Sequence, residues 1–301
     1  MTSRWDARPS ASPPVPLRRA DALMSGSSLV LRVEEQMRRV AARSTEHIAL
    51  HFGAHFPMYI GCGYPKSGTV WLCQLMGHYL GVPYPQNYVM PIAMSSVVHA
   101  HWRYDVRLPS TAYIRRDGRD VMVSLYFYEM RAAAQTRHPR AAAMRQSRFA
   151  RLFGAGFDPA DIRTHLPRFI EDEMSNPRGL RGTTWQQHVA EWCGQPHRNV
   201  THVTYEHLLD DPLATFSTLM TGVTGERADE DRVSLAVQRF DFSRTGREAG
   251  SEDRSSFMRK GIHGDWRNHF TRDAGEVFHR YAGEALRSLG YEDDPGWFEK
   301  L

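Results

Sequence analysis

The chain has 301 residues, of which 41% are hydrophobic and 24% are charged. This composition is typical of an ordinary soluble globular protein that can bury a substantial core. The formal net charge is +4, and acidic residues are interspersed with the basic ones. The charge therefore does not demand nucleic acid, and we expect none as a partner, whereas a basic balance suits a cofactor with several negative charges.

The cysteines and the N-terminal segment bound the cellular setting. Cys62, Cys73 and Cys193 show neither metal-site spacing nor an even disulfide framework, so we expect reduced thiols in a cytoplasmic protein. No apolar stretch approaches the roughly 20 residues that span a bilayer, and no stable membrane anchor is expected. Residues 1–28 are rich in Ser, Pro and Arg and lack the apolar core of a signal peptide. We expect a disordered tail there and one α/β domain over residues 29–301.

Apolar periodicity predicts strands that alternate with helices along this domain. The predicted helices cover residues 29–50, 68–80, 118–131, 185–192, 212–224 and 273–289. The predicted strands cover residues 56–61, 96–101, 111–115 and 199–204. Such alternation is typical of a central, mainly parallel sheet that helices flank on both faces.

Residues 132–181 interrupt this alternation, because they are rich in Ala and Arg and contain several prolines. We interpret the segment as an insert of short helices over the site that can close as a lid. A solvated surface excursion fits the composition equally well.

The first candidate site is the turn Tyr64-Pro65-Lys66-Ser67-Gly68-Thr69, between the first strand and its helix. A strand, a tight turn and a helix N-terminus in that order present backbone N–H groups to an anion. Lys66 adds a mobile charge, and Ser67 and Thr69 add hydroxyl donors. The nucleoside-triphosphate loop differs, since its lysine follows the second glycine and its hydroxyl reaches magnesium. No metal is therefore expected, and taken alone the segment also fits an ordinary surface turn.

Two further turns combine cations with helix N-termini. Arg116 stands at the carboxyl end of the 111–115 strand, and Ser124 follows two helical turns later, so the two can hold a second phosphate. Taken alone, Arg116 also fits a plain ion pair, and Asp117 and Asp120 fit a purely structural role at the helix dipole. Near the C-terminus, Arg259-Lys260-Gly261-Ile262-His263-Gly264 places adjacent cations before a Gly-x-x-Gly turn that can face an anion, or it is a basic loop before the last helix.

Together these segments resemble the cytosolic-type sulfotransferases that use 3′-phosphoadenosine 5′-phosphosulfate. Pro65-Lys66-Ser67-Gly68-Thr69 resembles their phosphosulfate loop, the run from Arg116 to Ser124 their 3′-phosphate motif, and Arg259 to Trp266 their C-terminal cofactor signature. Trp185-x-x-His188 with Val203-x-Tyr205-Glu206 resembles their middle segment. The likeness extends over roughly residues 55–290, in the family's order.

The resemblance implies an in-line transfer of a sulfuryl group from that donor to a hydroxyl or amine of a small molecule. It implies that Lys66 stabilises the leaving phosphate and that His101 is the general base. Histidine suits this role because its ordinary pKa lies near neutrality. The implied cofactor-binding residues are Lys66, Ser67, Gly68, Thr69, Trp71, Arg116, Ser124, Tyr205, Phe242, Arg259, Lys260 and Gly261.

Two departures from the family pattern qualify this interpretation. His99 replaces the family's lysine two residues before the base, and Val70 replaces a hydroxyl of the loop. The alternatives are a nucleotide kinase-like phosphotransferase and a non-catalytic nucleotide-binding protein. The acceptor is open, because the residues that suit an aromatic or lipid-like acceptor suit the core as well. These residues are Tyr84, Tyr88, Met90, Tyr126 and Tyr128.

Overall fold

The structure is a computed structural model of the chain, and its residues 1–40 form a unit separate from residues 41–301. It describes residues 33, 36–37, 39–53, 55–56, 58–85, 95–135, 139–177, 182–194, 197–241 and 261–301. The predicted tail of residues 1–28 lies outside the described residues. Residues 41–52 are helical and belong to the larger unit, and this helix extends two residues beyond the predicted end at residue 50.

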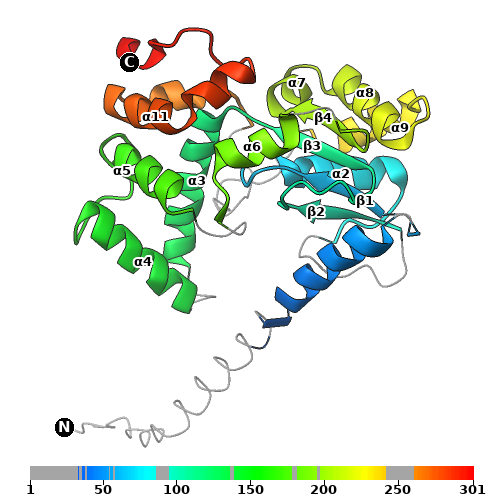
Figure 1. Cartoon of the computed structure of the whole chain (residues 1–301), viewed down its shortest axis with the longest axis horizontal. Helices are drawn as coiled ribbons and strands as arrows, with labels where there is room; N and C mark the ends of the chain where they lie inside the picture. Colours follow the sequence, from blue (N-terminus) through cyan, green and yellow to red (C-terminus); the bar gives the residue numbers. More distant parts are fainter. Residues whose placement is uncertain are drawn as a thin grey trace, which may run out of the picture. The chain divides into compact units, whose positions relative to one another are not determined.

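Within the described residues, the larger unit is built on a sheet of four strands, which are parallel, as predicted, and stand in the order β2-β1-β3-β4 (Figure 1). The strands are β1 (Met58–Cys62), β2 (Ser96–Ala100), β3 (Thr111–Arg115) and β4 (Val200–Thr204). β1, β2 and β3 are buried almost throughout, as parallel strands covered on both faces are. In the register Cys62 lies opposite Ala100 and Tyr113, and Arg115 lies opposite Thr204. All four carboxyl ends therefore meet at one edge.

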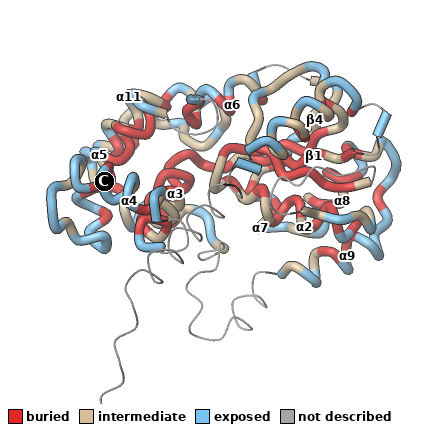
Figure 2. The backbone as a smooth tube through the Cα atoms, turned by 90° about the horizontal axis from the view of Figure 1, so that it is seen from below, coloured by how far each residue is buried: buried red, intermediate tan, exposed pale blue. Residues whose placement is uncertain are grey.

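Alternation along the strands sends side chains to two separate cores. Ile60 and Cys62 of β1 pack with Tyr113 and with Trp192 of α6 (Trp185–Cys193) on one face. Ala112 and Ile114 of β3 pack on the other face, against α2 (Thr69–Leu80), α8 (Pro212–Thr224) and α9 (Glu230–Arg239). Buried residues concentrate in the sheet between these two layers of helices (Figure 2).

A third core lies among helices beside the sheet, and it includes residues of the predicted helical insert, 132–181. α3 (Gly118–Ala134) packs against α4 (Pro139–Phe153) and α5 (Ile162–Ser175), and α5 packs against α11 (Arg272–Ser288). Phe149, Leu166 and Phe169 are fully buried there. Most of the described part of this segment forms two helices that share a hydrophobic core, so it is not a solvated surface excursion, and its closing as a lid stays a prediction.

Three short elements complete the description. α7 (Tyr205–Asp210) follows β4 directly, η2 (Asp265–Asn268) precedes α11, and η3 (Trp297–Lys300) follows it. α6 begins with the capping box of Thr184 and Gln187 that its sequence encodes. None of the helices in the described part of the chain combines the length and the hydrophobicity needed to cross a bilayer.

Candidate active site

Each of the four parallel strands that the structure describes is followed, within four residues, by a residue that the sequence predicts for the site. β1 leads into the Lys66 turn, β2 into His101, β3 into Arg116, and β4 into Tyr205. The chain leaves β1 toward β2 on one side, and it leaves β3 toward β4 on the other side. The crevice between β1 and β3 is thus the point where the strand order reverses, which is where open α/β sheets bind ligands.

The turn after β1 closes tightly and leaves two hydroxyl groups without partners. The Ser67 amide donates to the Tyr64 carbonyl at 3.1 Å, and Gly68 caps α2 with a φ of 97°. Within the described residues, the buried Ser67 Oγ and Thr69 Oγ1 atoms have no hydrogen-bond partner. A buried unpaired hydroxyl costs free energy, so these two groups at a helix N-terminus fit a bound anion.

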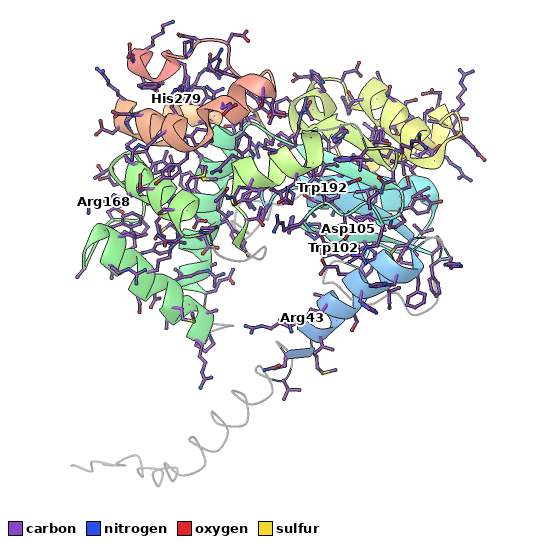
Figure 3. The ribbon with its side chains drawn as sticks, viewed as in Figure 1. Arg43, Trp102, Asp105, Arg168, Trp192 and His279 are labelled. Carbon is purple, nitrogen blue, oxygen red and sulfur yellow. The ribbon has the colours of Figure 1, made fainter. Side chains whose placement is uncertain are left out.

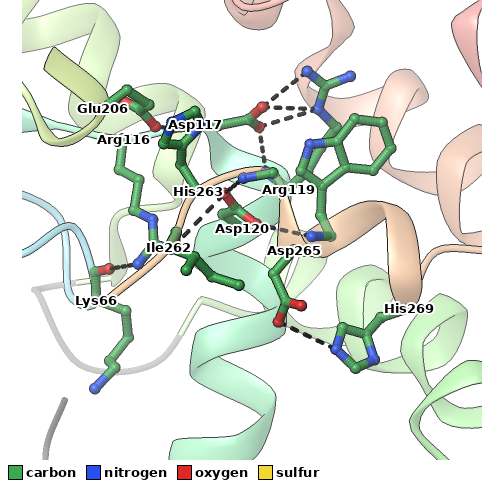
Figure 4. Close-up of polar contacts among 12 residues, drawn as sticks. Lys66, Arg116, Asp117, Arg119, Asp120, Glu206, Ile262, His263, Asp265 and His269 are labelled. Carbon is green, nitrogen blue, oxygen red and sulfur yellow. Dashed lines mark hydrogen bonds and ion pairs between the residues drawn. The ribbon is translucent and has the colours of Figure 1, made fainter. Parts of the chain in front are cut away.

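Arg116 joins this turn to the C-terminal loop (Figure 4). Its Nη1 atom donates to the Lys66 carbonyl at 3.3 Å, and its Nη2 atom donates to the Ile262 carbonyl at 3.1 Å. Its guanidinium stacks 4.2 Å from the centre of the Tyr205 ring. Asp120 lies 3.8 Å from Nη2, so Arg116 has the predicted acidic neighbour and also bridges two candidate anion-binding segments.

The predicted adenine-side residues are brought together in part. Trp71 and Tyr205 meet edge to face, with ring centroids 6.0 Å apart. The Trp71 indole N–H donates to the Phe240 carbonyl at 3.1 Å, which places α2 beside the end of α9. Phe242 lies outside the described residues.

The remaining predicted phosphate ligands that the structure describes are Ser124 on α3 and Gly261 in the C-terminal loop, residues 261–264. Ser124 is half-buried on α3, one helical turn after Asp120 and one before Tyr128, and so on the same face as both. Gly261 has a φ of 62°, and the next residue, Ile262, contacts Arg116. Arg259 and Lys260 lie outside the described residues.

His101 is held in one tautomer by the turn. Its Nδ1 atom lies 2.5 Å from the Gly63 carbonyl oxygen, and because a carbonyl only accepts, Nδ1 carries the proton. The lone pair is then on Nε2. Burial lowers the pKa of His101 to about 4; the Gly63 hydrogen bond raises this pKa in part, and the Lys66 charge makes a smaller contribution that lowers it. The imidazole is therefore neutral at pH 7, the form that a general base requires.

His99 lies beside His101 and is neutral as well. The two rings meet edge to face, with centroids 4.5 Å apart. Burial lowers the pKa of His99 to about 3, with a smaller contribution from His101. The position where the family carries a lysine therefore supplies no positive charge at neutral pH.

His188 is a residue whose importance sequence reasoning missed. It is fully buried, and its Nδ1 and Nε2 atoms lie 3.0 Å from the Tyr113 hydroxyl and the Trp102 carbonyl. The Trp192 indole also donates to the Trp102 carbonyl, at 2.9 Å; Figure 3 labels both residues beside the sheet. The peptide that follows His101 is thus fixed by a buried network. The signal in the sequence was the Trp185-x-x-His188 pattern, which spacing alone could not connect to residue 102.

The aromatic residues suggested for an acceptor pocket separate into two groups. Tyr126 is part of the core between α3 and α5, where its hydroxyl contacts the Pro159 carbonyl and His165. Tyr128 faces the site, because the Lys66 ammonium lies 4.8 Å from the centre of its ring. Tyr84 lies near His99, with ring centroids 6.5 Å apart. Tyr88 and Met90 lie outside the described residues.

Comparison with known proteins identifies the family. The sulfotransferase domain family matches residues 107–290, which is more than half of the chain. The chain belongs to the sulfotransferase domain family. The matched range includes Arg116, Ser124 and Gly261 but begins after Lys66 and His101, so for these two residues the geometry described above is the independent observation.

Individual relatives support the assignment. The sulfotransferase is 25% identical to Sulfotransferase 1A1 of Bos taurus over 269 residues, which cover 74% of this chain and 81% of the relative. It is 24% identical to human Sulfotransferase 2B1 over 275 residues, which cover 77% and 67%. The mouse sulfotransferase SULT7A1, solved in complex with PAP, shares the fold with a TM-score of 0.55 at 19% identity, over 81% of this chain and 88% of that one. In the part of this sulfotransferase that the structure describes, no three His, Cys, Asp or Glu residues form a group suited to a metal ion.

Proposed function

We propose that this sulfotransferase uses 3′-phosphoadenosine 5′-phosphosulfate as donor and transfers its sulfuryl group, in the cytoplasm, to a hydroxyl or amine of a small molecule. The observation that carries the proposal is the meeting of the Lys66 turn, Arg116 and the neutral His101 at one edge of the sheet. Support also comes from the mouse relative, whose structure contains PAP, the desulfated form of that donor.

The residues at the site fit the donor's two charged ends. Ser67 and Thr69 offer buried hydroxyl groups without partners to one phosphate, together with the N-terminal amides of α2. Arg116 and Ser124, with Gly261 and the preceding Arg259 and Lys260, are assigned to the 3′-phosphate. Trp71 and Tyr205 are assigned to the adenine, and Phe242 is a further candidate. When bound, the donor supplies the sulfuryl group and an anionic phosphate as leaving group.

The chain's own residues then have two tasks. His101 accepts the acceptor's proton at Nε2, which is free because Nδ1 donates to Gly63. Lys66 places its ammonium against the negative charge that develops on the leaving oxygen. Most of the remaining work is positioning, as in phosphoryl transfer.

Calorimetric titration of the whole chain with 3′,5′-diphosphoadenosine tests the donor assignment. We expect saturable one-to-one binding that magnesium-ATP does not displace. A labelled-sulfate assay over phenols, alcohols, amines and glycosides then identifies the acceptor class. Preferential binding of magnesium-ATP would support a kinase instead, and tight nucleotide binding without transfer to any member of the panel would support a non-catalytic protein.

A further inference from the structure

The first turn of α3 carries a carboxylate, Asp120, whose role goes beyond complementing a helix dipole. Asp120 is only 2% exposed to solvent. Its two oxygens accept from two backbone amides of a segment more than 140 residues away, those of Gly264 and Trp266. The distances are 2.6 Å to the Gly264 nitrogen and 2.9 Å to the Trp266 nitrogen.

These amides belong to the part of the chain that carries the C-terminal cofactor signature. Gly264 adopts a φ of 76° and leads into η2, whose second residue, Trp266, donates its N–H to Asp120 of α3. Two residues earlier, the Ile262 carbonyl accepts from Arg116. The turn from Arg116 to Asp120, where α3 begins, therefore holds the loop by a donor and by an acceptor at once, as Figure 4 shows.

The same turn is itself firmly anchored. Asp117 caps α3 and pairs with Arg119, whose guanidinium stacks 3.9 Å from the Trp266 ring and 4.8 Å from the Trp297 ring. Arg119 also pairs with Glu292 at 2.7 Å. The loop is thus tied to a rigid support, and charge-assisted hydrogen bonds to a buried carboxylate are among the stronger polar contacts in proteins.

We propose that Asp120 is a positioning residue for donor binding: by holding the Gly264 and Trp266 amides, it presents the C-terminal loop to the donor's 3′-phosphate beside Arg116. The inference rests on the proposed donor. It assigns to Asp120 no contact with the nucleotide, because its oxygens face backbone amides and an anion would repel a phosphate.

Asp120→Asn tests the role, because asparagine has the same shape but places an NH₂ group against one of the two amides. We expect the Kd for 3′,5′-diphosphoadenosine and the KM for the donor to rise about tenfold or more, as loss of a charge-assisted hydrogen bond predicts. We expect kcat at saturating donor and the KM for the acceptor to stay within about threefold, since the reacting groups are untouched. Amide hydrogen exchange at Gly264 and Trp266, measured without nucleotide, should accelerate.

Asp172→Asn is the matched control, since Asp172 is a buried carboxylate of α5 that pairs with Arg148 at 2.6 Å and belongs to the helical layer. It should lower the Tm without changing donor affinity. Unchanged nucleotide affinity in Asp120→Asn, or an equal loss of affinity in Asp172→Asn, would overturn the inference while leaving the donor assignment intact. Failure of the unsubstituted chain to bind 3′,5′-diphosphoadenosine would instead overturn the proposed donor.

Discussion

Lys66 adopts a backbone conformation that lysine rarely takes. Its φ is 72°, and among the described residues other than glycine no other has a positive φ. Such a conformation costs about 1–3 kcal/mol and persists where the surroundings enforce it, often at functional sites. Here it turns the Lys66 carbonyl toward Arg116 while the side chain extends toward Tyr128.

Two substitutions, Lys66→Ala and Lys66→Gly, should therefore distinguish the effect of the lysine charge on turnover from the effect of the backbone conformation on stability. We expect both variants to lose turnover about 10²- to 10³-fold, because both lack the charge that neutralises the leaving group. We also expect Lys66→Gly to be more stable than Lys66→Ala by about 1 kcal/mol, since glycine adopts positive φ readily. Urea unfolding and initial-rate assays measure the two effects. A Lys66→Gly variant with turnover close to that of the unsubstituted enzyme would remove Lys66 from the mechanism.

His101→Ala should reduce turnover about 10²- to 10⁴-fold while nucleotide affinity stays unchanged, because the base acts on the acceptor. Since the pKa of His101 is lowered to about 4, the unsubstituted enzyme should keep its base deprotonated down to pH 5 and lose it as the pH falls through about 4. Rate measurements between pH 4 and pH 8 test this. A rate that titrates near pH 6.5 would indicate that another group limits the reaction.

At this scale the sequence predicts residue types well and their connections poorly. Lys66, Ser67 and Arg116 follow from the strand–turn–helix pattern, and the structure brings them together. The tautomer of His101 depends on the Gly63 carbonyl of a neighbouring strand end, and the role of Asp120 depends on amides far along the chain. Such contacts are set by packing, so no local pattern indicates them.

At the scale of the elements, the start of α2 packs closely against α7, which is distant in the sequence. Gly68 has a φ of 97°, and a Cβ atom at this position would lie 2.7 Å from the Tyr205 ring. Gly81, at the other end of the same helix, has a φ of 67°, and apart from its neighbours in the chain no described residue would lie within 4 Å of a Cβ atom added there. The two glycines therefore share a backbone requirement but differ in their surroundings.

Gly68→Ala and Gly81→Ala form a matched pair on this basis. Both should cost about 1–2 kcal/mol of stability through the left-handed conformation. Gly68→Ala should also push Tyr205 away and weaken nucleotide binding, whereas Gly81→Ala should leave the affinity unchanged. Chemical denaturation and calorimetric titration distinguish the two effects. Equal affinities in both variants would show that the Tyr205 ring does not contribute to the donor site.

The element that sequence reasoning described least well is the pair α4 and α5. α4 buries Arg148 together with Phe149, and this arginine is neutralised by Asp172 and Glu173 of α5. A charged residue on the inner face masks the apolar stripe by which an amphipathic helix is recognised. The strand bounds and the helix 212–224 were predicted closely because Gly, Pro and β-branched residues mark them locally.

Across the whole molecule, neutral histidines make stability depend on pH. Burial lowers the pKa of His99 and His188 to about 3 and that of His101 to about 4, from an ordinary value of 6.5. At these histidines the unfolded chain therefore binds more protons than the folded chain below pH 6.5. Each pKa unit by which the folded and unfolded states differ corresponds to about 1.4 kcal/mol of unfolding free energy. Asp117 and Glu206 act in the opposite direction, because burial raises the pKa of each.

We expect the Tm to be constant from pH 8 to pH 7 and to fall progressively as the pH drops from 6.5 toward 4. Calorimetric or fluorescence melting in buffers of matched ionic strength measures this. His188→Gln, which keeps an N–H donor and removes the titrating ring, should reduce the slope. A Tm that is flat between pH 7 and pH 5 would contradict neutral burial of these rings.

The parallel sheet and its helical layers could be predicted from the alternation of strands and helices. The strand order could not, because it depends on the side of the sheet edge to which each crossover connection places the next strand. The convergence of distant motifs could still be predicted, since parallel strands share a carboxyl edge.

The activity of the enzyme depends on this shared edge of the sheet. The proposed donor site uses residues that follow all four strands that the structure describes, so a chain that lacks any one of these strands should not bind the donor. Donor binding therefore requires the completely folded sheet. A chain with one strand misplaced should be inactive rather than active on other substrates.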